Sequence, residues 1–236
     1  MKHHPGVLML AMWLSLAPAF AQDNEQARYY VQQMIEMAAA NDDKGVQALQ
    51  RMLEQQHPRT APANPTQAAA AQQRGLDALQ QSELDAALRA FQQATQDDPG
   101  NAEAFSNLGL VYRKLSRLSD AERALLQALT LEPGRAAAWF QLAQIYALRN
   151  DAHRTLGALA NTYRFANNPM RAEEILRYIA ETEAAETLRS AALLTLRLYN
   201  LPAEPTLVPP TPVPANSAIK PLRGSSAPTA IAPHSP

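Results

Sequence analysis

Cysteine is absent from the 236 residues of this chain. Its absence excludes disulfide bonds, thiolate metal sites, a cysteine nucleophile and a lipidated N-terminal cysteine. Glycine is scarce, with 8 residues, and none lies in a phosphate-cradling loop or a G-x-S-x-G sequence. The nearest approach, Gly224-Ser225-Ser226, contains a single glycine. The sequence therefore indicates neither thiol chemistry nor a phosphate-binding loop.

The remaining chemistry-bearing side chains do not gather into motifs. The histidines beyond residue 21 fit no metal-ligand spacing and no H-E-x-x-H motif: His57, His153 and His234. The carboxylate pairs Asp97-Asp98 and Glu173-Glu174 are typical of solvated helix ends and faces. We therefore expect a protein that is not an enzyme and that holds no metal and no cofactor.

Neither sign of charge predominates, since the chain has 21 basic and 22 acidic side chains. This balance gives no electrostatic case for binding nucleic acid or an anionic membrane surface. Only the start of the chain is apolar over a long stretch. Because a spanning helix needs about 20 apolar residues, we expect no membrane span once that start is removed.

The first 21 residues have the pattern of a signal peptide. Lys2 precedes an apolar run over residues 7–17, and Ala19-Phe20-Ala21 matches an A-x-A cleavage site. Pro18 interrupts the apolar run, which disfavours the alternative of a membrane anchor. We expect cleavage after Ala21 and, from the composition rich in alanine and glutamine, a periplasmic location in a bacterial envelope. Secretion beyond the envelope remains an alternative.

The rest of the chain is predicted to be all-α, because apolar residues recur at three- and four-residue spacing and no stretch alternates like a strand. Residues 22–56 are predicted to form a helical hairpin, with Asn41-Asp42-Asp43 at its turn. Residues 57–66 contain three prolines and are expected to form a linker.

From residue 67 the sequence repeats with a period of 34 residues. Pro99-Gly100 and Pro133-Gly134 are separated by this period, and so are Gly75 and Gly109. A fixed period of this length with two amphipathic helices per unit is typical of a stacked helical array. Three units are expected, over residues 67–101, 102–135 and 136–167.

The repeated pattern resembles that of tetratricopeptide repeats, with an aromatic, Leu-Gly and Tyr in the first helix and Ala, a large residue and Pro in the second. The third unit departs from it in its second helix, where Thr155, Thr162 and Asn167 stand in place of Ala, Ala and Pro. The resemblance implies an α-solenoid with a helical hairpin at each end. The core it implies consists of Gly75, Ala87, Phe91, Phe105, Leu108, Gly109, Tyr112, Ala121, Leu125, Trp139, Leu142 and Tyr146.

The sequence predicts the local structure of three further segments. Ser119 and Glu122 have the spacing of a capping box that would start the second helix of the middle unit. Residues 168–200 are predicted to form divergent helices that cap the solenoid. Residues 201–236 contain ten prolines and are expected to be a disordered tail. Its VPPTPVP stretch fits an aromatic groove or a spacer, and we favour the spacer.

The resemblance also implies that the first helix of each unit lines a concave groove. The side chains expected there are Gln72, Gln73, Leu76, Ser106, Asn107, Leu110, Arg113, Lys114, Phe140, Gln141 and Gln144. Because amides both donate and accept hydrogen bonds, this set suits a peptide backbone or an uncharged helix face. A carboxylate clamp like that of chaperone adaptors is not expected, since only Asn107 matches it.

These patterns favour a non-catalytic scaffold that binds a segment of another envelope or periplasmic protein in the groove. A second interpretation is a small-ligand-binding or sensing protein that uses Trp139, Phe140 and the groove amides. A third is self-association into an oligomer or filament through the ends of the array. The sequence leaves these alternatives open and does not identify the partner.

Overall fold

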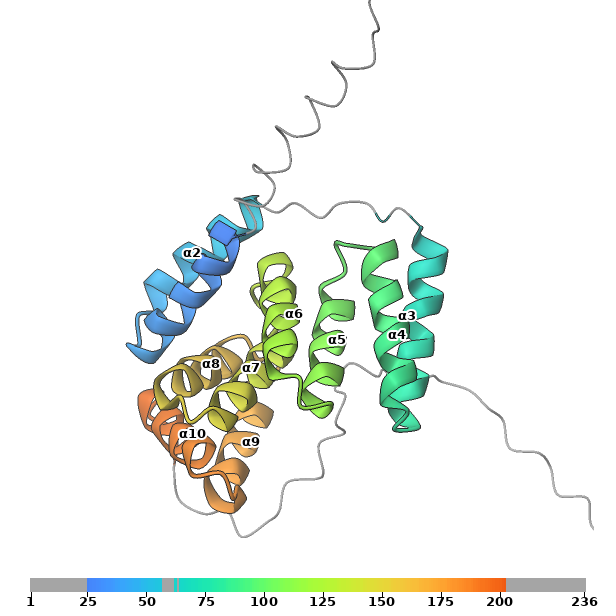
Figure 1. Ribbon diagram of the computed structural model, residues 1–236. Helices are drawn as coiled ribbons and strands as arrows, with labels where there is room; N and C mark the ends of the chain where they lie inside the picture. Colours follow the sequence, from blue (N-terminus) through green and yellow to red (C-terminus); the bar gives the residue numbers. More distant parts are fainter. Residues whose placement is uncertain (1–24, 57–61, 63, 203–236) are drawn as a thin grey trace, which may run out of the picture.

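The computed structural model describes residues 25–56, 62 and 64–202, and within them every regular element is a helix (Figure 1). An N-terminal helix spans residues 25–39. It is followed by α2 (Asp43–Gln56), α3 (Pro65–Gln80), α4 (Leu84–Asp97), α5 (Ala102–Lys114), α6 (Leu118–Leu131), α7 (Ala136–Leu148), α8 (Ala152–Arg164), α9 (Pro169–Thr182) and α10 (Glu186–Leu198). The all-α prediction is confirmed. The predicted leader and all but the start of the predicted tail lie outside the described residues.

The helices pack as consecutive pairs, α3 with α4, α5 with α6 and α7 with α8. The second helices of these pairs begin at Leu84, Leu118 and Ala152, in step with the 34-residue period of the sequence. Neighbouring pairs join where α4 contacts α5 and where α6 contacts α7, and α5 also touches α7. The predicted solenoid of helix pairs is therefore confirmed.

One residue in the left-handed conformation closes the turn inside each pair. Ser82, Ser116 and Asn150 have φ values of 61°, 59° and 55°. The N–H of the residue that follows donates to a carbonyl five positions back, as in Arg117 to Tyr112 at 2.8 Å. This is the Schellman arrangement, which satisfies carbonyls that the helix end leaves free. The turns therefore follow the same period as the helices.

The Schellman turn also explains why the predicted capping box is wrong. The chain re-enters a helix at Leu118, with Arg117 at the N-cap and no side-chain cap. Ser119 consequently lies inside the first turn, where it has no helix start to cap. Asp120 instead forms ion pairs with Arg117 and Arg123.

The N-terminal hairpin docks far along the chain and not against α3, its neighbour in sequence. Figure 1 shows it beside α6 and α8, with α3 and α4 at the other end of the molecule. The Asn161 amide of α8 donates to the Met34 carbonyl at 3.1 Å. Gly157 lies so close to the N-terminal helix that a Cβ at this position would be 2.2 Å from the Ile35 carbonyl oxygen. The hairpin thus covers part of the second-helix layer formed by α6 and α8.

The last hairpin does not continue the repeat geometry. α10 contacts α8 more extensively than α9 does, and it also touches α7. After α10, the Tyr199 ring packs on the Tyr163 ring with centroids 4.7 Å apart. In a continuing array, the first helix of the next pair would contact α8 and α7 in the way that α10 does. α10 therefore closes the third unit, and α9 lies outside it.

Most of the core is one cluster that joins the N-terminal hairpin with α6, α7, α8, α9 and α10, and its largest fully buried side chain is Trp139. The first unit is packed in smaller clusters, one of which consists of Ala71, Ala94 and Ala104. Of the predicted core residues, Phe105 and Tyr112 are partly exposed and the others are buried.

Candidate partner-binding face

The predicted binding residues lie on the first helices α3, α5 and α7, whereas the N-terminal hairpin contacts the second helices α6 and α8. We call the side formed by α3, α5 and α7 the groove face. Its side chains differ widely in exposure. The exposed ones are Gln73 and Lys114, the half-buried ones are Gln72, Leu76, Arg113, Phe140 and Gln144, and the buried ones are Ser106, Asn107, Leu110 and Gln141.

Two buried amides on this face have a polar atom without a hydrogen-bond partner. Asn107 is 4% exposed and Gln141 is 9% exposed. The Asn107 Nδ2 donor and the Gln141 Oε1 acceptor are both buried, and neither has a hydrogen-bond partner among the described residues. Leaving such a group unsatisfied costs about 1–3 kcal/mol. The two residues are 34 apart in sequence, so they occupy equivalent positions in the contacting helices α5 and α7.

Arg113, in the last turn of α5, adds a third unpaired group, because its Nε is also buried without a partner. Burial lowers the pKa of the Arg113 guanidinium from its ordinary value. No carboxylate of the described residues lies within ion-pair distance of Arg113. Arginine stays protonated at neutral pH, so this end of α5 offers a partly desolvated cation with a free donor.

In contrast, the amides of the first unit take part in hydrogen bonds with neighbouring side chains. Asn101 Nδ2 donates to Gln72 Oε1 at 2.9 Å, and Gln73 Nε2 donates to Asp77 at 2.8 Å. These bonds engage the Gln72 acceptor and the Gln73 donor, and neither amide has a buried unpaired atom. Among the predicted groove residues, the buried groups without a hydrogen-bond partner in the described part of the chain therefore lie in the second and third units, on Asn107, Arg113 and Gln141.

Trp139 is committed to the core and is not available to a ligand. It is 0% exposed, its Nε1 donates to the Pro133 carbonyl at 2.8 Å, and its ring stacks on Phe165 with centroids 6.5 Å apart. Two clefts have volumes of about 500 and 480 Å³, one lined by α3 and α4 and the other by the N-terminal helix, α5 and α6, and neither is lined by Trp139 or Phe140. This arrangement gives no support to a small-ligand pocket built on these rings.

Within the described ranges no cluster of histidine, aspartate and glutamate could hold a metal ion. In the same part of the chain, none of the helices combines the length and apolar character that crossing a bilayer demands.

Sequence reasoning selected Asn107, Arg113 and Gln141 but gave them the same weight as Gln72 and Gln73. What separates the two groups is whether a neighbouring side chain satisfies each amide. The only signal in the sequence was the 34-residue spacing of Asn107 and Gln141.

No curated protein matches this sequence. A solved structure of a Thermobaculum terrenum O-GlcNAc transferase mutant is similar to it with a TM-score of 0.46 and 21% sequence identity, over 59% of this chain. This chain covers 28% of that chain's length. The sequence profile of the tetratricopeptide repeat matches residues 73–130 and 107–154. Residues 73–154 therefore match the tetratricopeptide repeat in sequence profile, and they form the stacked helix pairs of such an array.

Proposed function

We propose that this protein is a non-catalytic scaffold that binds an extended segment of another protein along the groove face, at its second and third units. Tetratricopeptide repeats generally mediate protein–protein interaction, which supports the proposal at the level of function class. The observation that carries it is the pair of unpaired, buried amide atoms on Asn107 and Gln141. A peptide backbone supplies one acceptor and one donor per residue, which matches the free donor of Asn107 and the free acceptor of Gln141.

Arg113 indicates which chemical group the partner should carry at this end of α5. Its unpaired, partly desolvated guanidinium favours a partner that places a carbonyl or a carboxylate at this end of α5. An isolated C-terminal carboxylate is not the proposed ligand, because only Asn107 matches the clamp that chaperone adaptors use.

We further propose that the protein acts in the periplasm, where it meets another envelope protein. The A-x-A site at Ala19-Phe20-Ala21 and the absence of cysteine support export of a chain without lipid attachment. Fractionation of cells that express the full chain tests this, together with N-terminal sequencing for a start at Gln22. Recovery of the uncleaved chain in the cytoplasm would contradict it.

The binding site is tested with a double variant, Asn107→Leu and Gln141→Leu, and crosslinking in the native compartment followed by mass spectrometry. Replacing an unsatisfied buried amide with an apolar side chain of similar size removes a penalty of about 1–3 kcal/mol. We therefore expect the variant to be at least as stable as the wild type, yet to lose its crosslinked partners. The matched control is Gln96→Leu on α4, an exposed glutamine outside the groove face. If the double variant recovers the same partners as the control, the groove face is not the binding site.

A second candidate function, self-association, is favoured by apolar side chains exposed on the last hairpin. Met170 and Tyr178 on α9 and Leu194 on α10 are 75%, 47% and 46% exposed. Contacts between array ends would bury them. Light scattering over a wide concentration range distinguishes the two functions, because a chain that stays monomeric excludes self-association.

A further inference from the structure

A cleft of about 480 Å³ lies between α5, α6 and the N-terminal helix. Its apolar wall is formed by Phe105, Leu108 and Tyr112 of α5. Arg123 and Gln127 of α6 and Arg28 of the N-terminal helix supply polar groups. The cleft exists because the hairpin docks on the second-helix layer and brings Arg28 opposite α5 and α6.

Two polar atoms in this cleft are buried without a hydrogen-bond partner, the Arg28 Nε donor and the Gln127 Oε1 acceptor. Asp120, the carboxylate that lines the cleft, is engaged by Arg117 and Arg123. The free donor and the free acceptor therefore have no mate within the described residues.

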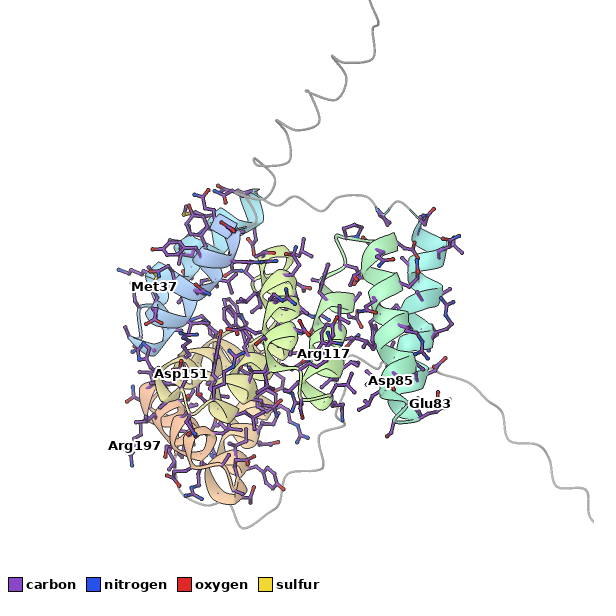
Figure 2. All side chains as sticks on the ribbon, in the orientation of Figure 1. Met37, Glu83, Asp85, Arg117, Asp151 and Arg197 are labelled. Atoms are coloured by element: carbon purple, nitrogen blue, oxygen red, sulfur yellow. The ribbon has the colours of Figure 1, made fainter. Side chains whose placement is uncertain are left out.

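The aromatic wall is held in place. Gln92 Nε2 donates to the Tyr112 hydroxyl at 3.0 Å, and the Arg117 guanidinium lies 4.6 Å from the centre of the Tyr112 ring. Figure 2 shows Arg117 at the end of α5 and α6 where the chain turns between them. Fixed, partly exposed rings beside free hydrogen-bonding groups are the features with which aromatic grooves bind proline-rich segments.

This chain carries such a segment beyond the described residues. The last of these is Pro202, whose carbonyl accepts from Arg177 Nε at 3.0 Å. The 34 residues that follow, 203–236, include VPPTPVP at 208–214. In that stretch only Val208, Thr211 and Val213 have a backbone N–H, while every residue has a carbonyl.

We propose that residues 208–214, which the sequence alone favoured as a spacer, instead dock in this cleft of their own chain as a polyproline II segment. Proline rings pack on Phe105 and Tyr112, a carbonyl accepts from Arg28 Nε, and the N–H of Thr211 or Val213 donates to Gln127 Oε1. At about 3.1 Å per residue, the twelve residues from 203 to 214 extend about 37 Å. Because Pro202 is held at α9, this length lets the segment run along the surface of the folded body, whose expected radius of gyration is about 16 Å. Tethering also raises the effective concentration of the segment to the millimolar range.

The absence of cysteine permits a direct test on the full chain. A single Ser217→Cys substitution carries a spin label just beyond the segment, with no competing thiol. We expect the backbone amide signals of Tyr112 and Gln127 to lose most of their intensity by paramagnetic broadening. Those of Gln73 and Gln80, on the exposed side of α3, should keep theirs.

Two variants of the labelled chain decide whether the cleft causes the broadening. Replacing Pro209, Pro210, Pro212 and Pro214 with alanine changes nothing inside the described fold, and it should restore the signals. Arg28→Leu should restore them as well, whereas Arg89→Leu on α4 should not. Broadening that is absent, that is spread over all faces, or that survives the proline substitutions overturns the proposal. Mixing spin-labelled chains with isotope-labelled chains lacking the label separates a further outcome. Broadening in the isotope-labelled chains shows docking between copies and overturns docking within one chain.

Discussion

The first and third units share one repeat pattern but are stabilised in different ways. The third unit buries Trp139, and its surroundings include the N-terminal hairpin, α6 and α10. The equivalent positions 34 and 68 residues earlier hold Phe105 and Ala71. Ala71 belongs to a small buried cluster with Ala94 and Ala104, and the first unit joins the rest of the solenoid through α4 and α5. Equal period therefore does not mean equal stability.

The comparison shows how the helices outside the repeats, those of the N-terminal hairpin and α10, contribute to the stability of the third unit. In an array, the stability of each unit is approximately its own term plus the interfaces with its neighbours. The third unit has additional interfaces with the hairpin and with α10. The first unit has an interface on one side and one of its core clusters consists only of alanines, so we expect it to be the least stable part of the fold.

Hydrogen exchange should show the largest difference between the two units. We expect α3 and α4 to open with a free energy well below the global value, which is roughly 5–15 kcal/mol for a domain. The amides of α7 should exchange only through global unfolding, since that helix is buried on nearly all sides. Native-state exchange at increasing denaturant measures both. Identical opening energies for α3 and α7 would abolish the distinction.

Truncation of the Trp139 side chain should cost the third unit about 3–5 kcal/mol, as for other large buried aromatics. It also removes the hydrogen bond to the Pro133 carbonyl. The matched variant in the first unit is Phe91→Ala, another fully buried aromatic. We expect Phe91→Ala to open α3 and α4 while leaving exchange in α7 unchanged, whereas Trp139→Ala should lower the global midpoint in urea. Equal effects of the two variants on α7 would contradict the comparison.

Gly157→Ala should weaken hairpin docking by about 1–3 kcal/mol, the usual cost of overpacking. The added Cβ would meet the Ile35 backbone, which cannot yield as a side chain does. Gly134→Ala is the control, because its nearest neighbours, Phe165 and Gln50, lie 3.8 and 3.9 Å from an added Cβ. Exchange rates in residues 25–39 should rise in the first variant only. Unchanged rates would show that Gly157 does not set the distance between the helices.

The smallest effect is expected for Asp43→Asn, which removes the ion pair between the hairpin and Arg164 of α8. The Asp43 side chain is 55% exposed, and pairs of this kind contribute about 0–1 kcal/mol. Urea unfolding at low and high salt measures this contribution, which salt should screen in the wild type and not in the variant. A loss comparable to that of Gly157→Ala would mean that charge, and not packing, holds the hairpin.

Local patterns in the sequence were sufficient for the helices and for the units they form. The period of 34, the turn residues Ser82, Ser116 and Asn150, and the small residues at helix contacts all act between neighbours in the chain. The capping box failed because a competing local motif, the Schellman turn, restarts the helix earlier.

The candidate site was predicted only in outline. Gln73 and Gln141 hold the same amide at equivalent positions of the first and third units, but the Gln73 amide donates to Asp77, while the acceptor of Gln141 remains free among the described residues. Burial and pairing depend on which side chains meet across helices, and the sequence pattern does not encode those meetings. The docking of the hairpin was missed for the same reason. In the sequence, this docking was indicated only by Gly157 and Asn161, which lie one helical turn apart on α8. A glycine inside a helix costs about 1 kcal/mol relative to alanine, so its presence there suggests a close contact with another segment.

By itself, the sequence determined an all-helical repeat array and its register, because these depend on contacts within a period. Only the tertiary structure decided that the hairpin covers α6 and α8, that α10 and not α9 closes the third unit, and that Asn107 and Gln141 are buried without partners. Those features arise from contacts between segments up to 127 positions apart. At that separation no periodicity links the residues, and complementarity of shape and hydrogen bonding selects the arrangement.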